Sequence, residues 1–140
     1  MLYFEHNSPL LIIVLCYNIT MKNNDIVFEI IKKSKNHLTA YEILNKFQNI
    51  KKVQPMSVYR SLNKLISENK IHKSNQTKRY MLCNHSHKNH NPSIAICKKC
   101  GETEELNSNL FEEILNKKIF KKYDFKNYEL EVSAICKACN

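Results

Sequence analysis

Two Cys-x-x-Cys pairs, Cys97/Cys100 and Cys136/Cys139, have the residue types and spacing that most clearly indicate chemistry in this chain. Cysteine thiolates are soft ligands that suit zinc, and four of them leave no coordination position open for a substrate. The pattern therefore predicts a structural zinc site that closes the C-terminal end of the fold. A redox pair of the thioredoxin type is the alternative, and the absence of a βαβ pattern around Cys97 argues against it.

A second group of potential metal ligands lies upstream and consists of histidines, one cysteine and one carboxylate: His72, Cys83, His85, His87, His90 and Glu105. This group is larger than one site needs. A single histidine is more often a surface residue than a ligand, but three of these fall within six positions between the two halves of the chain. A mixed set of this kind favours zinc over iron. We therefore predict a metal-binding hinge, and the spacing alone leaves its exact ligands open.

Positive charge is concentrated just before this hinge. The formal net charge is +9, and residues 46–80 contain nine Lys or Arg residues against one acidic residue, Glu68. Such a surface attracts a polyanion such as DNA. A lysine-rich face that is merely solvated is the competing interpretation, so the predicted fold has to decide between them.

The length and composition limit the classes of protein that are possible. A chain of 140 residues forms one domain or two small ones, and its single glycine, Gly101, argues against the glycine-rich loops that bind nucleotides. The Cys-x-x-Cys pairs with nearby histidines argue against a secreted disulfide scaffold. We expect reduced thiols in the cytoplasm, with no membrane association and no small-molecule substrate.

The first twenty residues are the one feature that could suggest export. Residues 9–17 are apolar but too few to span a bilayer as a helix, and Glu5 and His6 precede them without any Lys or Arg. We interpret residues 1–20 as an N-terminal extension that is not translated, with synthesis beginning at Met21. A genuine structural segment is the alternative.

The next sixty residues read as three helices followed by a β-hairpin. Helical spacing of apolar residues predicts helices over 25–33, from the capping box Thr39/Glu42, and from Pro55, where the missing N–H of proline has no helical partner to lose. Strand-like runs at 71–73 and 78–82 enclose a polar turn at 74–77. This order is typical of a winged helix-turn-helix.

The third predicted helix is suited to contact DNA. Its inward stripe is Val58, Leu62, Leu65 and Ile66, and its outward residues are Ser57, Arg60, Ser61 and Lys64, with Tyr59 and Asn63 at the edge. An arginine can pair with guanine in the major groove, and a tyrosine ring can pack against thymine methyl groups. We predict that Ser57, Tyr59, Arg60 and Lys64 contact DNA. An ordinary three-helix core with a solvated Arg60 is the alternative.

The C-terminal part reads as a small α/β unit. Strands are predicted over 93–97, 102–106 and 128–134, and the helix between the last two is expected to turn Leu110, Phe111, Ile114 and Leu115 inward. In the last strand we expect Tyr128, Leu130, Val132 and Ala134 to form the buried face, with Glu129, Glu131 and Ser133 opposite. Because a unit this small exposes a sheet edge and a helix face, we expect two copies to pair through them.

These motifs together resemble the ferric uptake regulator family, and within it the zinc uptake regulator branch. The resemblance runs from about Met21 to the end and rests on six segments of the sequence: Thr-Ala-Tyr-Glu-Ile-Leu from Thr39, Ser-Val-Tyr-Arg-Ser-Leu from Ser57, His72-Lys73, Tyr80-Met-Leu-Cys83, Ala-Ile-Cys-Lys-Lys-Cys-Gly from Ala95, and Cys136-Lys-Ala-Cys139. It implies a homodimeric, zinc-responsive repressor of zinc uptake genes, not an enzyme, which binds an AT-rich palindromic operator.

The resemblance also implies an assignment of the metal ligands. Its regulatory zinc would be held by His72, Cys83, His90 and Glu105, and its structural zinc by the four paired cysteines, so that each chain holds two Zn²⁺. Iron-type members have a histidine three residues before the first knuckle cysteine, and that position is Ile94 here. This difference favours a zinc sensor over an iron or peroxide sensor.

Two features depart from the family pattern. The stretch 21–24 lacks the arginine of the family's Thr-x-x-Arg element, which puts one DNA contact in doubt. His85 and His87 lie close enough to replace His90, and motif spacing is the reason for preferring His90.

The resulting prediction is an α+β chain with an N-terminal winged helix-turn-helix and a C-terminal α/β dimerisation domain that contains a structural zinc knuckle. Its segments are the extension (1–20), the DNA-binding domain (21–83), a His-rich hinge (84–92) and the dimerisation domain (93–140). The main alternative function is a DNA-binding module with structural zinc only.

Overall fold

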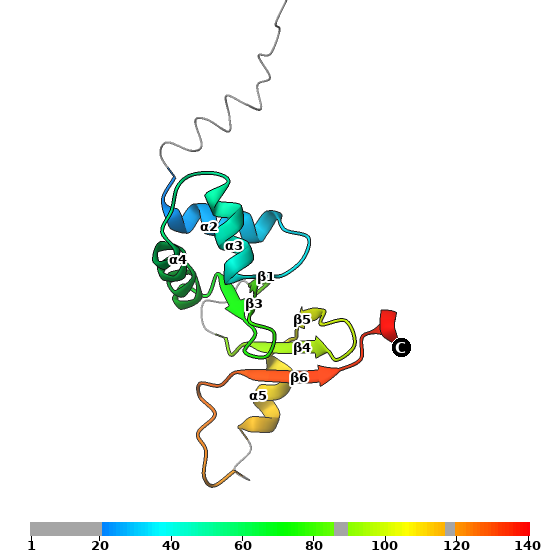
Figure 1. The fold of residues 1–140 in the computed structure, drawn as a ribbon. Helices are drawn as coiled ribbons and strands as arrows, with labels where there is room; N and C mark the ends of the chain where they lie inside the picture. The colour runs from blue at the N-terminus through cyan, green and yellow to red at the C-terminus, as the bar shows by residue number, and fades with distance from the viewer. Residues whose placement is uncertain (1–20, 86–89, 117–119) are drawn as a thin grey trace, which may run out of the picture.

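The computed structural model of the chain describes residues 21–85, 90–116 and 120–140. The N-terminal extension and His87 lie outside these residues. Two three-stranded sheets follow one another along the chain, with three helices above the first and one helix below the second (Figure 1). None of the helices within the described ranges has the length and apolarity that crossing a membrane requires.

Three helices, α2 (Asn23–Lys33), α3 (Ala40–Gln48) and α4 (Pro55–Ser67), form the N-terminal unit. Each presents apolar residues at helical spacing, and these meet in one core. The fully buried centre of this core contains Phe47, Ile43, Leu62, Leu65 and Val27. The core therefore fixes α4 by its inner face and leaves its outer face open.

The predicted helix starts at Thr39 and Pro55 are confirmed. The Thr39 hydroxyl accepts from the Glu42 amide, and the Glu42 carboxylate accepts from the Thr39 amide at 2.7 Å. This hydrogen bond from the Thr39 amide, assisted by the Thr39 hydroxyl, lowers the pKa of Glu42. Pro55 is the first residue of α4. Both starts follow from local sequence, because a cap acts only on the turn that it closes.

The first sheet forms the wing. It is antiparallel in the order β1 (Leu38–Thr39), β3 (Arg79–Leu82), β2 (Ile71–Lys73). We predicted that the last strand begins at residue 78, but it begins at Arg79, because Lys78 has a φ of +58° and cannot continue an extended strand. The turn between β2 and β3 is the wing tip, residues 74–78.

The second sheet has the order β5 (Thr103–Glu105), β4 (Ser93–Cys97), β6 (Leu130–Ala134). β4 and β6 are parallel, so the chain crosses over between them through α5 (Asn109–Leu115), which lies on the side of the sheet away from the three helices (Figure 1). A short 3₁₀ helix, η1 (Lys137–Cys139), ends the fold. The predicted α+β arrangement is confirmed.

The outward face of α4 is as predicted except at Ser61. Tyr59 is 46% exposed, and Arg60 and Lys64 are exposed. Ser61 was expected to point outward but is buried, because its hydroxyl donates to the Ser57 carbonyl at 2.9 Å and so needs no water.

The predicted burial in the C-terminal half is wrong at four of its eight positions, and the other four, Phe111, Leu115, Tyr128 and Leu130, are half-buried. Leu110 and Ile114 of α5 are 68% and 52% exposed, and Val132 and Ala134 of β6 are exposed. The periodicity identified the apolar faces correctly, but no layer of the described chain covers them. A face of this kind requires a partner surface.

We expect Thr39→Ala to lower the free energy of unfolding by about 1 kcal/mol, because it removes the hydroxyl that caps α3. Thr39→Ser retains the hydroxyl and should remain within about 0.5 kcal/mol of the wild type. Urea denaturation followed by circular dichroism measures both. Equal losses in the two variants would show that the threonine methyl group, and not the cap, stabilises this helix.

Candidate metal centres and nucleic-acid interface

The two cysteine pairs meet at the C-terminal end of the second sheet. The parallel register of β4 and β6 places Cys97 opposite Ala134, which brings Cys136 beside the turn that carries Cys100. The four sulfur atoms lie within 4.8 Å of one another. Gly101, with a φ of +75°, closes the turn by donating from its amide to the Cys97 carbonyl at 2.9 Å.

The electrostatics of these thiols fit a cation. Backbone amides of Cys136 and Cys100 lower the pKa of Cys97 to about 6, whereas hydrogen bonding to the Cys136 and Cys100 thiols raises the pKa of Cys139 to about 12. Four thiolates at this separation require a bound cation to offset their repulsion, and a Cys₄ set suits zinc.

The second cluster joins the two sheets. His72 lies on β2, Cys83 follows β3, His90 precedes β4, and Glu105 ends β5. Their ligand atoms lie within 4.8 Å of one another. Two ligands thus come from the wing and two from the second sheet, so one bound ion would contact both parts of the chain.

The ligand atoms converge on one point. The Nε2 atoms of His72 and His90 are 2.9 Å apart, and Glu105 Oε1 is 3.0 Å and 3.3 Å from them. Cys83 Sγ is 3.4 Å from His90 Nε2. The side chains of His72, His90 and Glu105 are only 4%, 6% and 2% exposed. Two ring nitrogens, a thiol and a carboxylate in a buried cluster form a donor set that fits zinc.

Hydrogen bonds lower the pKa of the Glu105 carboxyl group, which favours the ionised form that binds a cation. Burial alone would raise the pKa of Glu105, but hydrogen bonds from His72, the Asn84 amide and His85 lower it to about 2. The Asn84 amide donates to Oε2 at 2.8 Å, which orients the carboxylate. Burial raises the pKa of the Cys83 thiol, so this ligand has to lose a proton when a metal binds.

His85 lies beside this cluster but outside the group of four. Its Nδ1 is 2.9 Å from Glu105 Oε1, and its side chain is 26% exposed. The geometry therefore brings His90 into the group of four and leaves His85 as a hydrogen-bond partner of the carboxylate. The spacing of the motif supplied the only sequence signal for this distinction.

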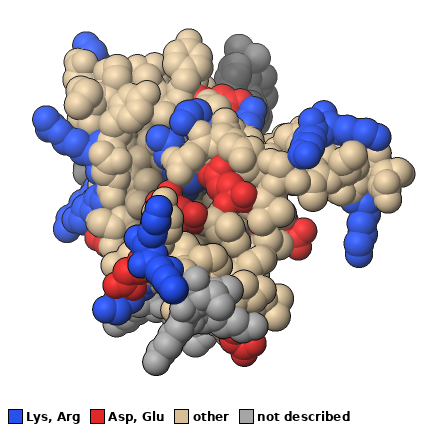
Figure 2. Space-filling view, turned by 90° about the horizontal axis from the view of Figure 1, so that it is seen from below, with Lys and Arg blue, Asp and Glu red and all other residues tan. Residues whose placement is uncertain are grey.

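The outer face of α4 is the candidate nucleic-acid interface. Ser57, Arg60 and Lys64 are three and four residues apart and so share one face, with Tyr59 beside them. Lys64 Nζ is 3.9 Å from Glu68, and both side chains are solvent-exposed, so the pairing leaves Lys64 largely free to meet a phosphate. The opposite end of the molecule, seen from below in Figure 2, shows basic and acidic side chains mixed together.

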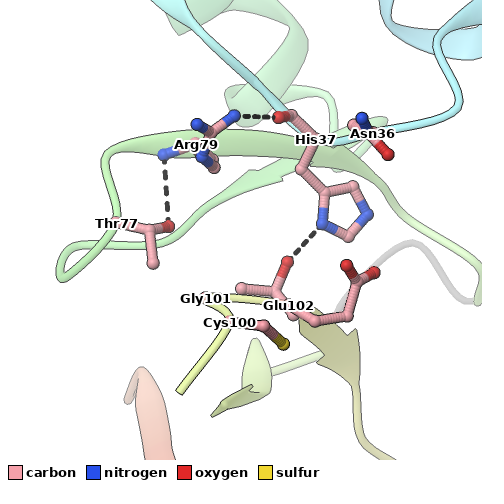
Figure 3. A pocket seen from close by; sticks show the side chains of 8 residues that line it. Asn36, His37, Thr77, Arg79, Cys100, Gly101 and Glu102 are labelled. Carbon is pink, nitrogen blue, oxygen red and sulfur yellow. Dashed lines mark hydrogen bonds between the residues drawn. The ribbon is translucent and has the colours of Figure 1, made fainter. Parts of the chain in front are cut away.

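Sequence reasoning missed a further set of contacts between the wing and the second sheet, which lies outside the hinge cluster. His37, just before β1, contacts the Thr103 hydroxyl through Nδ1, and Arg79 donates to the His37 carbonyl (Figure 3). These residues line a cavity of about 370 Å³ together with Glu102. Burial lowers the pKa of His37, although the charge of Glu102 opposes this effect. No periodicity or motif spacing signals such a contact.

Comparisons with known proteins agree with this geometry. The sequence model of the ferric uptake regulator family matches residues 17–135. The zinc uptake regulation proteins of Escherichia coli (strain K12) and Shigella flexneri are each 27% identical over 105 residues, which cover 73% of this chain and 61% of the relative. The matched region thus spans about three fifths of each relative.

Solved structures show the same fold. A zinc uptake regulator complexed with zinc and DNA superposes with a TM-score of 0.75 at 23% identity and covers 94% of this chain and 90% of its own. Holo XcZur gives 0.68 at 23% identity, with 85% and 84% covered. The Helicobacter pylori ferric uptake regulator gives 0.56 at 24% identity, with 94% and 89% covered.

We expect the zinc affinity of the cluster that joins the sheets to increase about tenfold per pH unit between pH 7 and 8.5. The raised pKa of the Cys83 thiol means that zinc displaces one thiol proton when it binds at these pH values. Chelator competition at several pH values measures the slope. Cys83→Asp supplies a carboxylate that is already ionised and should give a flat profile; a slope that persists in Cys83→Asp would exclude Cys83 as the source of the proton.

Proposed function

The chain belongs to the ferric uptake regulator family of metal-responsive transcription regulators, and from this premise we propose that it is a zinc-responsive, sequence-specific DNA-binding repressor that controls zinc uptake genes. The observation that carries this proposal is the cluster of His72, Cys83, His90 and Glu105, which connects the wing to the second sheet. The curated relatives named as zinc uptake regulation proteins support the same choice.

The ligand types support zinc as the signal. One thiol and two imidazoles favour a borderline-soft ion over a hard one. The position three residues before Cys97 is Ile94, which is 2% exposed and packs with Met81 and Ile96 in the second core. An iron-type histidine ligand is therefore replaced by a core residue. This argues against the alternative of an iron or peroxide sensor.

We propose two zinc ions per chain with different roles. The four cysteines would hold the first ion as a closed structural site, because they leave no open position for exchange. The cluster at the hinge would hold the second ion as the regulatory one. Its weaker, mixed donor set and its position between two sheets suit a site that fills and empties.

The regulatory effect follows from where the four hinge ligands are attached. A bound zinc would supply one positive centre shared by all four ligands. His72 and Cys83 belong to the wing, whereas His90 and Glu105 belong to the second sheet, so holding them together fixes the angle between the two parts. Zinc binding then favours, among the hinge angles that the chain can adopt, the one that binds DNA. By thermodynamic linkage, DNA binding should increase the affinity for zinc by the same factor.

DNA recognition requires two copies of the chain. The uncovered apolar faces of α5 and β6 support pairing of the second sheets in a homodimer, consistent with the family. A two-fold dimer presents two α4 helices to two half-sites, which supports a palindromic operator. We propose that the operator is AT-rich and that the protein acts in the cytoplasm, where chromosomal DNA is accessible.

Within each half-site, the exposed residues of α4 would make two kinds of contact with DNA, to base edges and to phosphates. Arg60 is suited to pair with a guanine, and Tyr59 to pack against a thymine methyl group. Ser57 and Lys64 are suited to phosphate contacts, which set the position of the helix on the duplex.

The proposed function predicts the zinc content of the protein and its effect on DNA binding. Wild-type protein should contain two zinc ions per chain, and chelating the more labile one should lower operator affinity by at least tenfold. Cys83→Ser should retain one tightly held zinc and lose the dependence of DNA binding on zinc. Metal analysis by mass spectrometry, combined with fluorescence anisotropy on labelled operator DNA, measures both quantities.

Cys100→Ser serves as the contrasting variant, because it removes a ligand of the four-cysteine site and should unfold the second sheet instead of uncoupling it. Lys98→Ser changes an exposed neighbour in the same turn and should behave as the wild type. One zinc per chain in the wild type, with metal-independent DNA binding, would instead establish a DNA-binding module with structural zinc only.

A separate prediction concerns the contacts of α4 with DNA. Arg60→Ala should weaken binding to the operator by about 1–3 kcal/mol and relax its preference at one base pair, whereas Lys64→Ala should weaken binding to all sequences alike and reduce the salt dependence. Titrations against the operator and a scrambled duplex at two salt concentrations separate the two effects. Equal losses on both duplexes for Arg60→Ala would place this residue on the phosphate backbone.

A further inference from the structure

The wing tip is held by polar residues of β6 and of the position just before it. We propose that Glu129, Glu131 and Ser133 form a clamp on Asn75 and Gln76, and that the wing of this protein is therefore a strut that orients α4 and is not itself a DNA-contacting element. The inference rests on the proposed function in one respect only, namely that α4 binds DNA.

The contacts in this clamp are direct. The Glu131 carboxylate accepts from two successive backbone amides, from Asn75 through Oε1 and from Gln76 through Oε2 at 3.1 Å. The Asn75 side-chain amide donates to Glu129 Oε2 at 2.8 Å, and the Ser133 hydroxyl donates to Gln76 Oε1 at 3.2 Å. Each residue of the clamp thus contacts the wing tip, although more than fifty positions separate them in sequence.

Strand geometry explains why these three residues act together. Residues 131 and 133 alternate with apolar ones on one face of β6, and Glu129, the residue just before the strand, continues the same alternation. The wing lies on one side of the sheet (Figure 1), and this polar face is turned toward it. The polar residues of this alternating pattern would be expected to face solvent, but here they form the surface that contacts the wing tip.

The chemistry of the clamp opposes DNA contact at the wing tip. Successive backbone amides in a turn are the groups that bind a phosphate, and here a carboxylate already occupies them through charge-assisted hydrogen bonds. Two carboxylates at this point also repel the negatively charged DNA backbone. A phosphate would have to displace Glu131 to reach these amides.

The clamp adds a point of attachment at the tip of the wing, beyond the hinge cluster and the contact between His37 and Thr103 near the base of the wing. The hinge cluster holds the wing through His72, and Asn75 is three residues further along, a distance of about 10 Å in extended chain. Contacts near its base alone leave the tip of the wing free to move, whereas a further contact at the tip fixes the direction of the wing. Because β3 and α4 share the core of the N-terminal unit, the direction of the wing sets that of α4.

The direction in which one substitution changes the affinity for DNA tests this inference. Glu131→Ala removes a negative charge, which by electrostatics alone should strengthen DNA binding. The strut instead predicts that the affinity of the zinc-loaded protein for operator DNA falls about tenfold. Glu104→Ala removes the same charge from an exposed position on β5 and should leave the affinity unchanged or slightly higher. Glu131→Gln retains an oxygen acceptor and should recover part of the loss.

A second readout follows the clamp without DNA. Hydrogen exchange measured by NMR should be faster at the Asn75 and Gln76 amides in Glu131→Ala than in the wild type, and adding operator DNA to the wild type should leave their protection unchanged. Asn75→Ala removes the contact to Glu129 without changing any charge, and should weaken DNA binding in the same direction. Zinc content and circular dichroism establish that each variant is folded.

An affinity in Glu131→Ala that equals or exceeds that of Glu104→Ala would overturn the strut, as would new protection of the wing-tip amides on DNA binding. The wild-type protein in the same assay reports separately on the proposed function. Loss of zinc-dependent DNA binding there, with normal exchange at the wing tip, would contradict the regulator and leave the clamp intact.

Discussion

The buried carboxylate of Glu105 imposes the constraint on which the arrangement of this molecule depends. A carboxylate that is 2% exposed is costly unless hydrogen bonds or a cation satisfy it. His72 comes to it from the wing, and His85 and His90 come from the connection between the two sheets. The two parts of the chain must therefore meet at one distance and in one orientation. The same convergence creates a set of ligands that a zinc ion can share, so the contact that joins the sheets is also the place where a metal can control their angle.

The two candidate metal centres act on different features of the fold. The four cysteines lie where β4 and β6 end, and a metal bound there would fasten the parallel pair that carries the rest of the second sheet. The position of β6 in turn decides where Glu129 and Glu131 meet the wing. A structural metal site at one end of the sheet would therefore stabilise the strand that contacts the wing tip. The hinge cluster connects the wing to the same sheet at a second place. The proposed structural site and the proposed regulatory site are thus separated in space but depend on the same strands.

Local sequence predicted the secondary structure well, because helix caps and apolar periodicity act over a few residues. The capping box at Thr39 and the start of α4 at Pro55 are examples. The errors arose where the outcome depended on more distant contacts or on backbone geometry. Ser61 is buried because its hydroxyl turns back to its own helix, and Lys78 is left out of β3 by its positive φ. Leu110 stays exposed because no layer of the described residues covers it.

By itself, the sequence determined the donor types, the two cysteine pairs, the winged-helix order of elements and the family resemblance, because each depends on residue identity and short spacing. Only the tertiary structure decided which histidine joins the hinge cluster, since His85 and His90 differ in where the chain carries them and not in their chemistry. It alone also showed that Glu131 faces the wing and not solvent. Alternation along a strand defines two faces, but what lies against each face is set by packing between segments that are distant in the chain.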